Sequence, residues 1–252
     1  MKTKSLRIGT ESLIQHSLLL DQVILPRHPP DWPIPLNLTL GLKEFLIIEG
    51  LTPAGAQELL SLAATLQFPT QGRVRYWGQE PAQGSRPELY RLRRRIAYIS
   101  PGQVLLGRLT VVENITLPAR YFQQRTMKEI VRDYSDLIER LELTPYFSCY
   151  PAELPADIYS RVLWACALIK KPELILAAPF SSPITLKNNH LILSLLRDYR
   201  EQHRGAVLLA GPDLQAARPL ADRLLRLQAG RLTEIRVPGH AAPPVTPYLS
   251  FL

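Results

Sequence analysis

Short apolar runs alternate with amphipathic segments along most of the chain. Residues 18–25 (LLLDQVIL) and 36–40 (LNLTL) are apolar or alternate in polarity, as β-strands do. The apolar run FLIIEG at 45–50 ends in glycine, and AQELLSLAATL at 56–66 follows it with helical spacing. The sequence therefore predicts a strand, a glycine-containing turn and a helix in this order, which is the setting that a phosphate-binding loop requires.

The alternation of strands and helices continues to residue 235. Four further segments predict strands: GRVRYWGQEP (72–81), RRRIAYIS (93–100), ELILAAPF (173–180) and AVLLAG (206–211). Helices are predicted over residues 127–143, 156–170 and 188–203, and residues 213–235 predict a helix followed by a hairpin. This alternation indicates an α/β fold with a mainly parallel sheet, and the helix-rich stretch from about 119 to 170 predicts a separate lobe.

The end of the chain has a different composition. Residues 237–252 (VPGHAAPPVTPYLSFL) are rich in proline, which supplies no backbone N–H for helices or sheets. We expect an extended tail there.

Composition and charge narrow the class of protein. Of 252 residues, 46% are hydrophobic, and no run of 18 apolar residues predicts a membrane span. The first 20 residues lack the apolar core and cleavage site of a signal peptide. The two cysteines lack metal-site spacing and indicate a reducing compartment. A net charge of +8 permits contact with an anionic membrane or a nucleic acid, although a solvated basic face explains it as well.

Several segments resemble those of the nucleotide-binding subunits of ABC transporters. The match runs in order, with nearly the family's spacing, over about residues 18–235. Its segments are TQGRVRYWGQEP with LYRLRRRIAYIS (a strand–turn–strand after the P-loop), LTVVENITLPARYF (109–122), YPAELPADIYSRVLWACALIKKPELILAAPF (150–180) and AVLLAGPDLQAARPLADRLLRLQAGRL (206–232). The segment ENITLPARYF is most similar to the lipid-transport branch associated with Mla and Mce systems.

The resemblance implies a fold and a domain. The fold would be the α/β P-loop NTPase-like fold of ABC ATPases, with a mainly parallel core sheet, an antiparallel β subdomain and a helical lobe. One nucleotide-binding-like domain would span residues 1–236, with the proline-rich tail at 237–252.

The segment that resembles the P-loop departs from the family's pattern. A P-loop follows G-x-x-x-x-G-K-[ST], whose backbone N–H groups and lysine hold the phosphates while the hydroxyl holds magnesium. Gly50 and Gly55 keep the glycines, but Ala56 replaces the lysine and Gln57 the hydroxyl, and Glu58 adds a carboxylate. Each lost charge-assisted hydrogen bond costs about 1.5–3 kcal/mol. Together the losses would weaken ATP binding by about a hundredfold or more.

The other nucleotide-facing motifs depart from the pattern as well. The strand that should end in Asp-Glu ends in Ala177, Ala178 and Pro179, without a carboxylate for magnesium or water. The Q-loop glutamine aligns with Pro101, although Gln103 lies two residues away and could compensate in part. The switch histidine aligns with Pro212. The signature L-S-G-G-Q corresponds to this run of residues: Leu154, Pro155, Ala156, Asp157 and Ile158.

These replacements predict a catalytically inactive ABC ATPase homologue, a pseudo-ATPase. We expect no catalytic residue, no metal site, and lost or weak binding of ATP and Mg²⁺. The resemblance implies a cytoplasmic protein, peripheral on the inner face of the plasma membrane, whose partners are an ABC-type permease and another nucleotide-binding subunit or a second copy, with no nucleic acid. It would be a structural or regulatory subunit of a transport complex. The similarity to the Mla and Mce branch makes lipid the candidate cargo. Two alternatives stay open: an adaptor that has left transport, and an active ATPase with non-standard ligands such as Gln57, Glu58 and Gln103.

Overall fold

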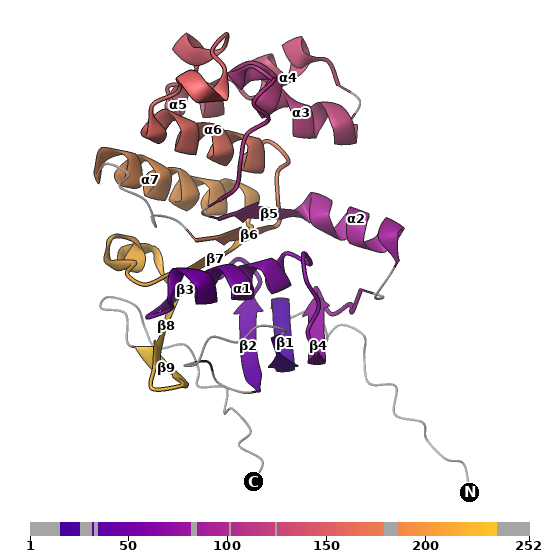
Figure 1. The fold of residues 1–252 in the computed structure, drawn as a ribbon, viewed down its shortest axis with the longest axis vertical. Coiled ribbons are helices and arrows are strands. Elements are labelled where there is room, and N and C mark those ends of the chain that lie inside the picture. The colour runs from indigo at the N-terminus through magenta and orange to yellow at the C-terminus, as the bar shows by residue number, and fades with distance from the viewer. Residues whose placement is uncertain are drawn as a thin grey trace, which may run out of the picture.

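A mainly parallel six-stranded sheet forms the centre of the molecule (Figure 1). The computed structural model describes residues 16–25, 32, 35–81, 85–100, 102–123, 125–178 and 186–235. Within them the strand order is β5-β6-β7-β3-β8-β9, and only β9 runs antiparallel to its neighbour. The strands are β3 (Phe45–Glu49), β5 (Ile96–Ile99), β6 (Leu174–Ala177), β7 (Ala206–Ala210), β8 (Arg223–Gln228) and β9 (Arg231–Ile235). The predicted α/β architecture is confirmed.

A second sheet of three antiparallel strands carries the N-terminal part of the described chain. Its order is β2-β1-β4, with β1 (His16–Ile24), β2 (Leu36–Gly41) and β4 (Gln71–Tyr76). Alternate residues of β2 are buried, as its polarity pattern predicts. The antiparallel β subdomain implied by the family resemblance is therefore present.

The helices form the lobe and cover the sheets. They are α1 (Pro53–Ala63), α2 (Arg86–Arg95), α3 (Val111–Gln123), α4 (Met127–Asp133), α5 (Ser135–Arg140), α6 (Ala156–Leu168) and α7 (Leu186–His203), with 3-10 turns η2 (Thr144–Tyr146), η3 (Pro151–Glu153) and η4 (Gln215–Leu220). Helices α3 to α6 gather in a lobe at the top of Figure 1, and α7 lies between this lobe and the core sheet. None of the helices described is long and apolar enough to cross a membrane.

The two faces of the core sheet belong to different hydrophobic clusters. Phe45 and Ile47 of β3 pack in the cluster that includes the lobe and α7. Leu46 and Ile48, which point to the opposite face, pack with α1 and the antiparallel sheet. Because β3 is buried on both faces, it is an uninterrupted apolar run, as expected of a central parallel strand.

Several predicted elements differ from those observed. The helix predicted over 127–143 is two short helices, because Tyr134 leaves helical geometry (φ −119°, ψ 21°) between α4 and α5. The helix predicted after residue 213 is the 3-10 turn η4, which contains Pro219, a residue without the N–H that an α-helix needs. The predicted hairpin at β8–β9 is confirmed. The segment LYRLRRR belongs to helix α2 and not to a strand–turn–strand unit.

A buried carboxylate joins three elements of the core. Glu49, the last residue of β3, is only 2% exposed. Arg218 of η4 donates two hydrogen bonds of 2.7 Å to the Glu49 carboxylate, and Arg226 of β8 donates a third of 3.3 Å. Burial alone would raise the pKa of Glu49, but the hydrogen bonds from both arginines outweigh it and hold the pKa below the ordinary 4.5.

We predict that Glu49→Gln lowers the free energy of unfolding by about 2–3 kcal/mol, because it leaves two arginines around a neutral amide. The measurement is urea unfolding followed by circular dichroism. The matched control is Glu173→Gln. Its partner Arg95 also donates two hydrogen bonds, but both side chains are exposed by 40% or more. The control substitution should lower the free energy of unfolding by less than about 1 kcal/mol. Equal decreases in the two variants would contradict the prediction.

The same carboxylate should make stability depend on pH. A glutamate whose pKa is lowered by folding stabilises the folded state above its unfolded pKa, and this contribution is lost as the pH falls through the folded value. The stability difference between the wild type and Glu49→Gln should therefore be constant near neutral pH. It should shrink once the pH drops below about 4.5. Unfolding curves at pH 7, 5 and 4 measure the difference, and one that grows with acid would refute this role of Glu49.

Candidate nucleotide site

Three loops meet at the carboxyl edge of the core sheet. Strands β6, β7 and β3 are parallel neighbours, so their carboxyl ends lie along one edge. The edge brings together the segments that begin at Gly50 after β3, at Ala178 after β6 and at Gly211 after β7. In open α/β sheets ligands bind at this edge, so it is the candidate site.

The loop after β3 is bonded to the loop after β7. Gly50 has a φ of +81°, and a Cβ there would lie 2.4 Å from the Leu227 carbonyl oxygen. The N–H groups of Gly50 and Leu51 donate to the carbonyls of Pro212 and Gly211, both at 3.3 Å. Residues predicted for the P-loop and the switch are therefore in direct contact, and two of the loop's donors are already used.

Helix α1 begins earlier than predicted. It starts at Pro53 rather than at residue 56 and ends at Ala63. Thr52 caps it: its hydroxyl accepts a hydrogen bond from the Gly55 N–H at 3.1 Å, and its carbonyl accepts one from the Ala56 N–H at 2.9 Å. The amides of the second glycine and of the lysine position thus belong to the first turn of the helix.

The side chains of this turn do not point to one centre. Ala56 is 1% exposed and packs in the core against the antiparallel sheet, whereas Gln57 is exposed. The Glu58 carboxylate accepts a hydrogen bond from Gln67 Nε2 at 2.7 Å, on the side of the helix. Pro53 has no N–H. The remaining backbone donors between residues 50 and 56 are therefore the N–H groups of Thr52 and Ala54.

The carboxyl end of β6 carries alanines where the family's pattern has acidic residues. Ala177 is buried within the strand, and Ala178 is 5% exposed with its N–H bonded to the Ile99 carbonyl at 2.9 Å. Pro179 lies outside the described residues, as do Pro101 and the tail 237–252. In the part of the chain that the structure describes, no group of three His, Cys, Asp or Glu residues could hold a metal ion.

The signature segment leads into helix α6 of the lobe. Leu154 follows η3, Pro155 precedes the helix, and α6 begins at Ala156. Pro155 and Ala156 are exposed, Asp157 is partly exposed in the first turn, and Ile158 is buried at 8%. The surface therefore presents a proline and a methyl group where the family's pattern has serine and glycine.

Gln103 lies in the segment that links the core to the lobe. Its N–H donates to the Ser100 carbonyl at 3.1 Å, and its side chain is exposed. Two residues later, the Leu105 N–H donates to the Tyr159 hydroxyl of α6 at 2.8 Å. The segment after the predicted Q-loop is thus hydrogen-bonded to the helix that follows the signature.

Two features of the site were missed by sequence reasoning. The pair Thr52-Pro53 has the pattern of a helix N-cap followed by proline in the first turn, so it could have placed the start of α1 correctly. Glu49 is an acid at the end of an otherwise apolar strand. This contrast could have indicated a buried ion pair, but nothing in the sequence points to Arg218 as its partner.

Comparison with known proteins identifies the family. The sequence profile described as ABC transporter matches residues 34–177. The chain is 31% identical over 199 residues to the methionine import ATP-binding protein MetN of Mesorhizobium japonicum, covering 79% of this chain and 54% of that protein. It is 30% identical to the phosphonates import ATP-binding protein PhnC 1 of Ruegeria sp., covering 78% of this chain and 79% of that one. The chain thus spans about half the length of the first relative.

Solved structures agree on the fold. A dimeric ATP-binding cassette holding ADP and phosphate superposes with a TM-score of 0.76 at 24% identity, covering 87% of this chain and 99% of that chain. The structure of cbiO1 from Clostridium perfringens, part of the ABC transporter complex cbiONQ, gives a TM-score of 0.72 at 16% identity, with 87% of each chain covered. At these identities the likeness shows the fold alone. Together with the matches in sequence, it establishes that this chain belongs to the ABC transporter family, as an ATP-binding domain.

Proposed function

We propose that this chain is a pseudo-ATPase: an ABC ATP-binding domain that neither binds nor hydrolyses ATP productively. One observation carries the proposal. The amides of Gly50, Leu51, Gly55 and Ala56 all donate to groups of the protein itself. A P-loop binds phosphate through such free backbone donors at a helix N-terminus. Here these donors are taken by the switch loop and by the early start of α1.

The side chains support the same proposal. An ABC-type reaction needs a cation at the phosphates, a metal ligand and an acid that orients water. Ala56, Gln57 and Ala178 stand at these positions, so phosphate charge would meet neither ammonium nor metal there. The chain's own residues do not fit Mg²⁺-ATP. The outward position of Gln57 and the bond from Gln67 to Glu58 also argue against substitute ligands in the active-ATPase alternative.

The role that we propose is that of a structural or regulatory subunit of a membrane transport complex. Relatives are named as import ATP-binding proteins for methionine and phosphonates, and one as the ATP-binding protein of a lipoprotein-releasing system. By analogy, this chain would bind a permease at the inner face of the plasma membrane, beside another nucleotide-binding subunit or a second copy. A lipid cargo is a finer proposal that rests on the segment ENITLPARYF alone.

A nucleotide titration tests the loss of ATP binding. We expect the purified chain to show no saturable binding of ATP with Mg²⁺ up to about 1 mM, because about 3 kcal/mol or more of phosphate contacts are missing. Isothermal titration calorimetry measures this, and the solved cassette that holds ADP and phosphate is the positive control. Micromolar affinity, or hydrolysis above a buffer blank, would support the active-ATPase alternative and end the proposal.

Purification from native membranes tests the proposed role. We expect the chain to sediment with membranes and to copurify with an integral membrane protein that has the sequence of an ABC permease. Addition of ATP should leave the recovered complex unchanged, because the proposed assembly does not depend on nucleotide. Recovery of the chain only from the soluble fraction, with no permease in mass spectrometry, would favour the adaptor that has left transport.

A further inference from the structure

Helix α2 concentrates positive charge on one short element. Its ten residues include five arginines and a single acid, Glu88. In Figure 1 the helix projects from the side of the molecule, and its carboxyl end leads into β5 at the edge of the core sheet. The helix needs only one face against the protein, and Leu89, which is 8% exposed, lies on that face. The number of arginines therefore has to be explained separately from the packing of the helix.

Two of the five arginines hold the helix to the rest of the protein. Arg93 donates to the Thr65 hydroxyl at 2.9 Å and to the Thr65 carbonyl at 2.6 Å, just after the end of α1. Arg95 donates hydrogen bonds of 2.7 and 2.6 Å to the Glu173 carboxylate, and its guanidinium lies 3.6 Å from the centroid of the Trp77 ring. The fold accounts for these two arginines.

The other three arginines lie on the exposed side of the helix. Arg86 and Arg94 are eight residues apart with Tyr90 halfway, so these three side chains share one face, and Arg91 lies beside them. All four are exposed, and we call them the basic stripe. Arg86 and Arg91 take part in no hydrogen bond or ion pair among the residues that the structure describes. Glu88 is two positions from Tyr90 and so does not share the face.

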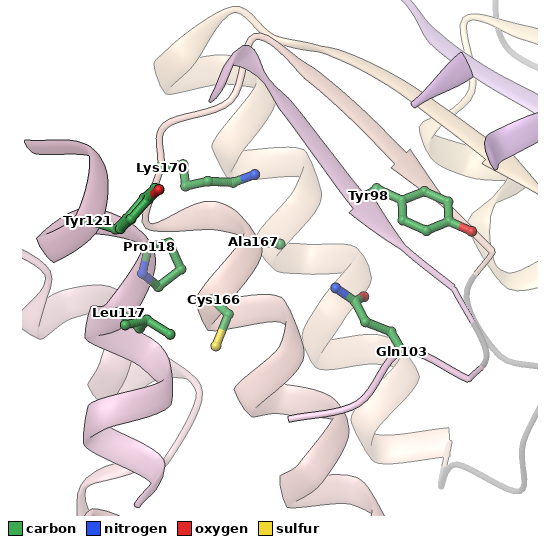
Figure 2. A pocket seen from close by; sticks show the side chains of 8 residues that line it. All are labelled: Tyr98, Gln103, Leu117, Pro118, Tyr121, Cys166, Ala167 and Lys170. Atoms are coloured by element: carbon green, nitrogen blue, oxygen red, sulfur yellow. The ribbon is translucent and has the colours of Figure 1, made fainter. Parts of the chain in front are cut away.

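The basic stripe has a defined place beside the lobe. The Tyr90 ring meets the Tyr121 ring of α3 edge-on, with 6.3 Å between the centroids and 66° between the planes. Figure 2 shows Tyr121 at the pocket between α3, α6 and β5, so the stripe lies next to this pocket but outside it. Because the stripe covers a convex helix that projects from the body, its shape fits a flat surface better than a small ligand.

We propose that the basic stripe binds the anionic headgroups of a lipid membrane. Arginine forms paired hydrogen bonds with phosphate oxygens, and tyrosine is enriched at the boundary between headgroups and hydrocarbon. The net charge of +8 attracts the whole chain to a negative surface, and the stripe supplies the contact. The inference rests on the proposed place at the inner face of the plasma membrane, but not on the loss of ATP binding.

Vesicle sedimentation of the purified full chain tests the stripe. The probes are vesicles of phosphatidylcholine alone and of phosphatidylcholine with about 30% phosphatidylglycerol, a charge density that attracts basic surfaces. We expect binding only to the anionic vesicles, and weaker binding in about 0.5 M NaCl because salt screens the charges. The triple variant Arg86→Gln/Arg91→Gln/Arg94→Gln should bind at least about tenfold more weakly, since each arginine at an anionic surface contributes up to about fivefold.

A matched variant removes the same charge elsewhere. Arg132→Gln/Arg197→Gln/Arg231→Gln changes three exposed arginines, on α4, α7 and β9. The two triple variants have equal net charge, so a difference between them reports the place of the charge. The matched variant should lose less than about threefold in affinity, because distant exposed charges are screened. Circular dichroism checks that both variants remain folded.

Three results would overturn the proposal. One is the absence of binding to anionic vesicles, and another is an equal loss of affinity in the two triple variants. The third is the result expected if an acidic segment of a partner protein occupies the stripe: a poly-glutamate peptide binds the chain and is lost in the stripe variant, while anionic vesicles do not bind. None of these results alters the nucleotide titration or the copurification with a permease, so failure of this proposal is distinguishable from failure of the proposed function.

Discussion

The need to satisfy backbone hydrogen-bond donors governs the candidate site. A buried N–H without a partner costs about 1–3 kcal/mol, so a loop that binds phosphate through its amides is poorly satisfied when the ligand is absent. In this chain the amides of Gly50 and Leu51 bond to the switch loop, and those of Gly55 and Ala56 bond to Thr52. These four amides of the loop are therefore satisfied by the protein itself. A nucleotide would have to break these bonds before it could use those four donors.

The same principle extends outward from the loop. The Glu49 carboxylate holds Arg218 of η4 and Arg226 of β8, so the segment after the switch is ordered by an internal anion. On the lobe side, Asn114 accepts from the Leu106 N–H at 2.8 Å and donates to the Leu106, Leu109 and Thr110 carbonyls. These bonds fix the segment that joins core and lobe without a ligand. This organisation supports the proposal of a structural subunit, which would have to keep its shape in the absence of ATP.

The sequence predicted the layers better than it predicted the site's details. Uninterrupted apolar runs identified the central strands and helical spacing identified α7, because burial in a layered fold imposes these patterns directly. The break at Tyr134 and the partners of Glu49 depend on contacts between residues far apart in the chain, which periodicity does not encode. The start of α1 was encoded locally, in Thr52-Pro53, but the helical spacing of apolar residues placed the start at residue 56 and the capping signal was overlooked. Motif alignment assigned the candidate site residues, yet it carried no information on whether the loop was open.

The retained glycine at the start of the loop illustrates that gap. Gly50 matches the first glycine of the phosphate-binding motif, and a match of this kind is usually taken as a sign of function. Its conformation explains it differently: φ is +81°, and any Cβ would come within 2.4 Å of the Leu227 carbonyl oxygen on β8. No side chain fits there, whether or not a phosphate is present. The glycine is a requirement of the β3–β8 packing, whereas the lysine position, which the fold does not constrain in this way, is Ala56. The first glycine therefore follows from the fold, and its presence alone does not report on ATP.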